Sequence, residues 1–84
     1  MDFIKYPPTV TALIEELINA CDGYIARIIT EQELRALIHS WGYSSGDKLF
    51  NGAKNFNPTV TQRLGKKRLK LVEAMLEGYQ QRIL

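Results

Sequence analysis

Five cations lie within eight residues near the C-terminal end of the chain, and no acid stands among them. They are Arg63, Lys66, Lys67, Arg68 and Lys70. Ammonium and guanidinium groups gathered in this way bind phosphates or carboxylates, and the free amides of a helix start offer further donors. The cluster is therefore the candidate anion-binding site, and nucleic acid is its first expected partner.

The position of these cations favours a partner over a purely structural role. Gly65 interrupts a helical pattern that resumes at Lys66, so Lys66 and Lys67 fall in the first turn of a helix. Cations there oppose the helix dipole, at a cost of some tenths of a kcal/mol each. Folding alone does not favour them, whereas a bound anion would. A merely solvated helix start remains the alternative.

The stretch around Gly65 also shows part of the helix-turn-helix pattern. Its inward positions and turn glycine are matched by Val60, Leu64, Gly65 and Leu71. Lys66 stands where that motif usually has an apolar residue, so the match is partial. Few side chains suited to reading base edges are present, and low sequence selectivity is expected.

Other chemistry finds little support in the residue types and their spacing. His39 and Cys21 are single and far apart, so no metal site is predicted. Cys21 lies on an apolar helical stripe, where a small core residue is expected in place of a reactive thiolate. Ser44 and Ser45 lack the surroundings of a nucleophile, and no phosphate-loop spacing occurs. We expect neither an enzyme nor a cofactor.

Composition predicts one ordered domain over residues 1–84, with 45% hydrophobic and 24% charged residues. No apolar run approaches the roughly 20 residues that a membrane span needs. The start of the chain has no signal-peptide layout, and a single cysteine gives no reason to expect an oxidising compartment. A cytoplasmic protein without membrane contact is therefore expected.

Residues 1–8 are expected to form an extended lead-in, because Pro7 and Pro8 push their predecessors out of helical geometry. An apolar stripe that runs on to Tyr24 and Ile25 predicts a first helix from about Thr9, ending between Cys21 and Ala26.

The second helix is expected from Glu31 to Trp41, opened by a capping box of Thr30 and Glu33 and ended by Gly42. Residues 43–56 are rich in turn formers and predict an irregular loop, with one helical turn over 47–50. Leu49, Phe50 and Phe56 are expected to anchor this loop on the core.

The last helix is expected to begin at Asn57 and Pro58, an N-cap followed by proline at the first helical position. Beyond the break at Gly65, the helical stripe comprises Leu69, Val72, Leu76, Tyr79 and Ile83. The fold class expected is all-α: a small bundle of about four helices, the last one longest.

A protein–protein interaction module remains the alternative function. Residues 57–84 carry six bases and two acids, whereas residues 1–56 carry five bases and seven acids. The basic face could meet an acidic protein surface in an adaptor or inhibitor, or the apolar stripe of the last helix could form a homodimer.

Four stretches resemble a family of short, uncharacterised proteins from Gram-positive bacteria of the Bacillus and Clostridium type. They are Leu13–Ile18, Thr30–Leu34, Lys48–Phe50 and Arg63–Leu69. The resemblance covers about Val10 to Leu76 and is most specific around Leu64–Leu69. It implies a small cytosolic protein and brings no activity with it.

Overall fold

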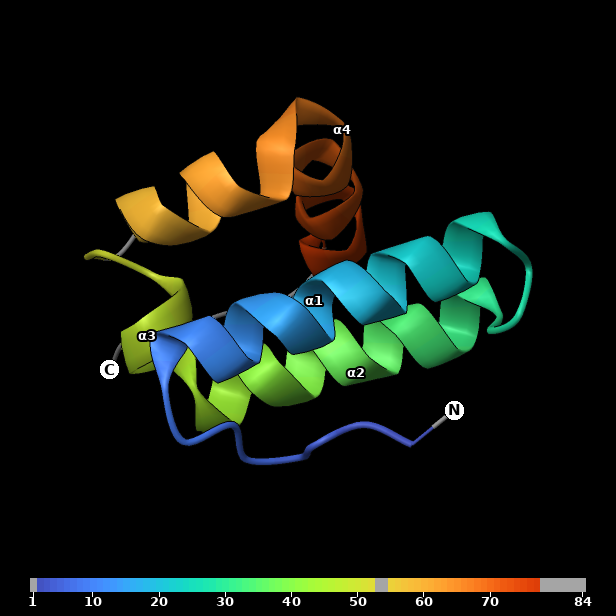
Figure 1. The fold of residues 1–84 in the computed structure, drawn as a ribbon, viewed down its shortest axis with the longest axis horizontal. Helices are drawn as coiled ribbons and strands as arrows, with labels where there is room; N and C mark the ends of the chain where they lie inside the picture. Colours follow the sequence, from blue (N-terminus) through green and yellow to red (C-terminus); the bar gives the residue numbers. More distant parts are fainter. Residues whose placement is uncertain (1, 53–54, 78–84) are drawn as a thin grey trace.

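The protein is an all-α structure, as the sequence predicts. A computed structural model describes residues 2–52 and 55–77 (Figure 1). Its helices are α1 (Val10–Ile25), α2 (Glu31–Ser44), α3 (Gly46–Leu49) and α4 (Pro58–Leu76). The expectation of four helices with the last one longest is confirmed, since α4 has 19 residues. Within the described residues the only β-type pairing is an isolated bridge between Phe50 and Phe56.

The helices α1 and α2 form an antiparallel hairpin, and α4 packs against both of them (Figure 1). The apolar faces of α1, α2 and α4, together with Leu49 of α3, meet in one core. The largest of its fully buried side chains are Trp41, Leu13, Ile14, Leu17, Leu34, Ile38, Leu49 and Leu64. The predicted inward stripes of these helices thus supply most of the core.

The interruption predicted at Gly65 is a sharp bend within α4. Gly65 has φ 78° and ψ 169°, a combination that is essentially restricted to glycine. An added Cβ would meet nothing within 4 Å, so the backbone conformation and not a lack of space requires glycine here. The two halves of α4 consequently run in clearly different directions (Figure 1).

The second helix is longer than its sequence indicates. Gly42 does not end it: α2 continues to Ser44, and Gly42 is buried inside it. Trp41 explains the difference, because its indole is 1% exposed and its carbonyl accepts from the Ser45 amide at 2.7 Å. Packing of this turn outweighs the cost of about 1 kcal/mol for a helical glycine. The predicted irregular segment therefore begins at Ser45, and α3 supplies its helical turn.

Residues 2–8, which we call the N-terminal strap, lie non-helically along the α1–α2 hairpin, as expected (Figure 1). The Trp41 indole N–H donates to the Ile4 carbonyl at 2.9 Å. The Phe3 ring meets the Trp41 ring edge-on, with 6.0 Å between centroids. One buried tryptophan thus fastens the strap to α2.

The segment between α3 and α4 is anchored as the sequence predicts. Leu49 is fully buried, and the rings of Phe50 and Phe56 pack together on the core with centroids 5.5 Å apart. Asn57 closes the segment, since its amide donates to the Leu49 carbonyl at 2.8 Å. Its side chain also accepts from the Thr59 amide at 2.9 Å, which confirms the predicted N-cap of α4.

The connection between α1 and α2 contains a strained residue. Arg27 has φ 61°, in the left-handed region that favours glycine. The Ile28 amide donates to the Gly23 carbonyl at 2.7 Å, and the Arg27 amide donates to the Tyr24 carbonyl at 3.0 Å. These two bonds form a Schellman motif, whose left-handed position is usually glycine. The expectation that Ile25 extends the buried stripe is wrong: Ile25 is 49% exposed, because the chain reverses just beyond it.

We expect Arg27→Gly to raise the free energy of unfolding by about 0.5–1 kcal/mol, because glycine relieves the left-handed strain. Urea unfolding followed by circular dichroism measures the change. Arg27→Ala is the matched control, since it removes the same charge but keeps a Cβ. Equal effects of the two variants would show that strain at this position is not the cause.

Candidate anion-binding site

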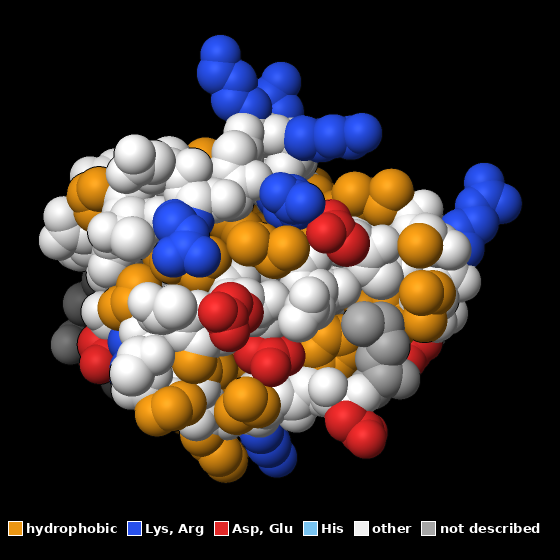
Figure 2. Space-filling model, in the orientation of Figure 1, with side chains coloured by type: hydrophobic (Ala, Val, Ile, Leu, Met, Phe, Trp, Pro, Cys, Tyr) orange, Lys and Arg blue, Asp and Glu red, His pale blue; other side chains and the backbone are white. Residues whose placement is uncertain are grey.

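Four of the five predicted site residues surround the bend of α4 as exposed side chains. Arg63 lies just before Gly65, and Lys66, Lys67 and Lys70 lie just after it, all exposed. Figure 2 shows Lys and Arg side chains gathered over this bend, projecting from the body of the molecule. We call these four residues the bend cations.

Arg68 differs from the bend cations because the chain's own carboxylate engages it. Its guanidinium donates to both oxygens of Asp22, through Nε at 3.0 Å and Nη2 at 3.1 Å. This hydrogen bond raises the pKa of Arg68. Among the described residues, ion pairs join Arg68 to Asp22 and Lys48 to Asp47, and none engages a bend cation.

The same guanidinium also reaches the bend itself. Arg68 Nη1 donates to the Leu64 carbonyl at 3.4 Å, at the last residue before Gly65. One side chain thereby connects the first half of α4, the second half of α4 and the end of α1. Arg68 is thus placed to hold the bend and so to fix where the neighbouring lysines project.

The other end of α4 is capped by two side chains from α2. Arg35 Nη1 donates to the Met75 carbonyl at 3.1 Å and to the Glu77 carbonyl at 3.2 Å. His39 Nε2 lies 2.6 Å from the Met75 carbonyl, and because a carbonyl only accepts, this ring nitrogen carries a proton. The positive Arg35 guanidinium at this helix C-terminus complements the dipole of α4.

At the start of the second half of α4, the Asp22 carboxylate of α1 engages Arg68 but no bend cation. The residues following Gly65 there are Lys66, Lys67 and Arg68, with no acid in that turn. Exposed Glu73 and Glu77 lie instead towards the C-terminal end. The surface charges of this half-helix thus oppose its dipole at both ends. An anion near the bend would complement Lys66 and Lys67, which no ion pair among the described residues engages.

The bend is tighter than the turn of a helix-turn-helix. That motif joins its helices through three or four residues, whereas Gly65 alone has non-helical geometry within α4. Val60 and Leu64 face inward, as the motif requires, but Lys66 is exposed where the motif has an apolar residue. The stretch that partly matches the helix-turn-helix pattern is therefore a bent helix with cations around the bend at Gly65.

Cys21 is a core residue, as its position on the stripe predicts. It is fully buried. Burial, more than the neighbouring Asp22 carboxylate, raises the pKa of its thiol to about 11. A thiol in this state is a poor nucleophile at neutral pH.

In residues 2–52 and 55–77, no three His, Cys, Asp or Glu side chains gather as metal ligands would. None of the helices in this part of the chain combines the length and apolar character that crossing a bilayer requires.

Sequence reasoning missed the side chains that support the site. Asp22 and Arg68 are 46 residues apart, and Arg35 lies 40 residues from Met75. One signal was available, because an acid such as Asp22 near the C-terminal end of a helix opposes the dipole and has no local reason to be there.

The fold and site define a small all-α protein: a helical hairpin covered by a bent, basic helix. A family model described as "Conserved hypothetical protein" matches residues 4–77, and the chain belongs to this family. The match confirms the resemblance to a family of uncharacterised proteins, and it spans the four helices that the structure describes and the bend cations. No curated protein and no solved structure matches the chain.

The ion pair between Asp22 and Arg68 is expected to stabilise the docking of α4 on α1. Both side chains are partly exposed, at 49% and 34%, so we expect a coupling free energy of about 0.5–1 kcal/mol. A double-mutant cycle of Asp22→Ala and Arg68→Ala in urea unfolding measures it. Strictly additive effects would exclude a contribution from the pair.

The pKa of Cys21 predicts a loss of stability in alkali. The thiol titrates near pH 9 in the unfolded chain and only near 11 when folded, so the unfolded state loses its proton first. The free energy of unfolding should therefore fall by up to about 1.4 kcal/mol per pH unit between these values. Cys21→Ala is the control, and its stability should fall less steeply. Parallel pH profiles of the two proteins would contradict the assignment.

Proposed function

We propose that the protein is a non-enzymatic binding protein that contacts nucleic-acid phosphates through the bend cations. The observation that supports this most is the placement of exposed lysines at the start of a half-helix whose dipole they oppose. Arg68 has a positioning role in this proposal, because Asp22 already engages its guanidinium. The basic bend of α4 takes the place of the helix-turn-helix that the sequence partly resembles.

The proposed binding is of low sequence selectivity. Lysine and arginine side chains on phosphates fix position and carry no direct sequence information. Phe50 and Phe56 line a hollow together with Lys70, but their rings pack against each other and on the core. The proposal therefore does not include base stacking. Affinity would come mainly from the release of counterions and would fall with added salt.

The alternative is a protein–protein interaction module, an adaptor or inhibitor whose bend cations meet an acidic protein surface. The homodimer expected through the last helix finds less support, because Val72 and Met75 are buried in the chain's own core. Tyr79 and Ile83 of that expected stripe lie outside the described residues.

We also infer a cytoplasmic protein of Gram-positive bacteria of the Bacillus and Clostridium type. The resemblance in sequence and the match to a family of conserved hypothetical proteins support the origin. The buried, unpaired Cys21 thiol is compatible with a reducing compartment.

Fluorescence anisotropy with labelled duplex DNA and RNA tests nucleic-acid binding. With four phosphate contacts, the logarithm of the association constant should fall against the logarithm of salt concentration with a slope of about 3–4. Lys66→Ala, Lys67→Ala and Lys70→Ala should each reduce that slope by about 0.9. Arg27→Ala removes an exposed cation at the tip of the α1–α2 hairpin and is the control. A slope near zero, or an equal effect of Arg27→Ala, would refute the proposal.

The double variant Lys66→Glu/Lys67→Glu separates lost binding from lost folding. It should abolish binding while raising the free energy of unfolding by about 0.3–1 kcal/mol per site, because acids suit a helix start. Polyglutamate serves as the competitor. If it displaces DNA at equal charge concentration, an acidic protein surface becomes the better partner.

A further inference from the structure

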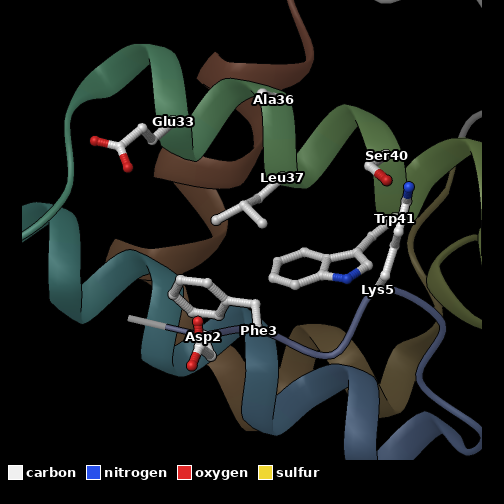
Figure 3. A pocket seen from close by; sticks show the side chains of 8 residues that line it. All are labelled: Asp2, Phe3, Lys5, Glu33, Ala36, Leu37, Ser40 and Trp41. Carbon is white, nitrogen blue, oxygen red and sulfur yellow. The ribbon is translucent and has the colours of Figure 1, made fainter.

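A shallow groove lies between α2 and the N-terminal strap, away from the bend cations. It consists of two hollows of about 460 and 600 Å³, which share Lys5, Ala36 and Ser40. Figure 3 shows the first hollow, where Phe3 and Leu37 face the same open space beside Trp41. We call the two hollows together the α2 groove.

The rim of the α2 groove exposes large apolar side chains. Tyr43 is 87% exposed and Tyr6 is 67% exposed, and both line the second hollow. Figure 2 shows several hydrophobic side chains at the lower left of the molecule, where the strap runs in Figure 1. The short side chains of Ala36 and Ser40 leave the middle of the groove open. Apolar surface gathered in this way marks an interaction site.

The two ends of the groove differ in charge. Asp2 and Glu33 line the first hollow; in Figure 3 Glu33 lies above and Asp2 below on its left, apart from each other, and Lys5 lies on its right. The second hollow contains no acid among the described residues that line it, and it includes Lys5 and His39. His39 is engaged at the Met75 carbonyl of α4. Lys5 extends over the Tyr6 ring, 5.8 Å from its centroid.

We propose that the α2 groove binds a second copy of this chain in a two-fold symmetric dimer, with the two α2 helices antiparallel. Two-fold symmetry pairs the same patch on both copies. The acidic end of each copy then meets the Lys5 end of the other, so both ends are complementary at once. Tyr43 of each copy covers the apolar middle of the partner groove around Ala36.

The size of the face is sufficient for this dimer. The molecule measures 36 × 24 × 24 Å, and the strap and α2 run along it (Figure 1). The smallest specific interfaces bury roughly 600 Å² on each partner, which a face of these dimensions can supply. Both sets of bend cations stay exposed, because they lie on the opposite side of the molecule from the groove (Figures 1 and 2).

An exposed apolar patch at the tip of the α1–α2 hairpin does not fit a second copy. Ile25 and Ile28 are 49% and 62% exposed at the tip of the α1–α2 hairpin, on either side of Arg27. Two such tips in a two-fold contact would bring Arg27 against its own copy. Like charges placed together disfavour that contact, whereas the α2 groove is self-complementary.

Sedimentation equilibrium of the full chain, from about 1 μM to 1 mM, tests the dimer; the range suits a small interface. We expect a monomer–dimer equilibrium. Ala36→Glu should raise the dimer dissociation constant at least tenfold, because it places charge and bulk in the middle of the groove. Ala36 is exposed and helical, so folding should persist, and circular dichroism verifies this. Tyr43→Ser, at a more exposed residue, should weaken the dimer in the same direction.

Two matched control variants test whether the dimer interface lies at the α2 groove. Ala74→Glu makes the same change at an exposed position of α4, and Ile28→Glu adds an acid to the hairpin tip; both should leave the dissociation constant within about twofold. A monomer at every concentration would overturn the proposal. So would a dimer that survives Ala36→Glu, or one that Ile28→Glu disrupts instead. These results do not depend on nucleic-acid binding, which the salt-dependent anisotropy tests separately.

Discussion

The arrangement of α4 depends on burying an apolar face on each side of the bend at Gly65. Gly65 makes a bend possible, but a single residue with positive φ does not choose which surface the second half-helix covers. Val60 and Leu64 before the bend and Val72 and Met75 after it are buried in the core. The Arg68 guanidinium adds a contact that joins both halves of α4 to the end of α1. The direction of the exposed lysines follows from that placement.

Neighbouring cations just after Gly65 have different surroundings in the structure. Arg68 is partly buried and bound within the chain, whereas its neighbours Lys66 and Lys67 are exposed beside a helix start that disfavours them. At the far end of α4, Arg35 and His39 satisfy the carbonyls from a different helix. The fold thus complements the C-terminal end of the half-helix, whereas at its start Asp22 engages Arg68 and Lys66 and Lys67 stay exposed.

Local sequence signals predicted the structure correctly where neighbouring residues determine it. Thr30 and Glu33 form the expected capping box, Asn57 caps α4, and Gly65 interrupts it. Tertiary packing decided the rest. Gly42 stays helical because the turn around Trp41 is buried, and no local pattern shows that burial.

The candidate site could be predicted only in part from the sequence, for the same reason. Spacing in the sequence placed the bend cations together, and the structure keeps all four exposed. The distinct position of Arg68 depends on Asp22, 46 residues earlier, and a contact over that separation appears only once the helices are packed.

The attachment of Trp41 to the strap gives the chain an optical probe of its own. Trp41 is the only tryptophan of the sequence, and its indole is enclosed under Phe3 while its N–H binds the Ile4 carbonyl. Intrinsic fluorescence therefore reports one specific event, the seating of the N-terminal segment on α2. Release of that segment would admit water to the ring and shift the emission to longer wavelength, even with every helix intact.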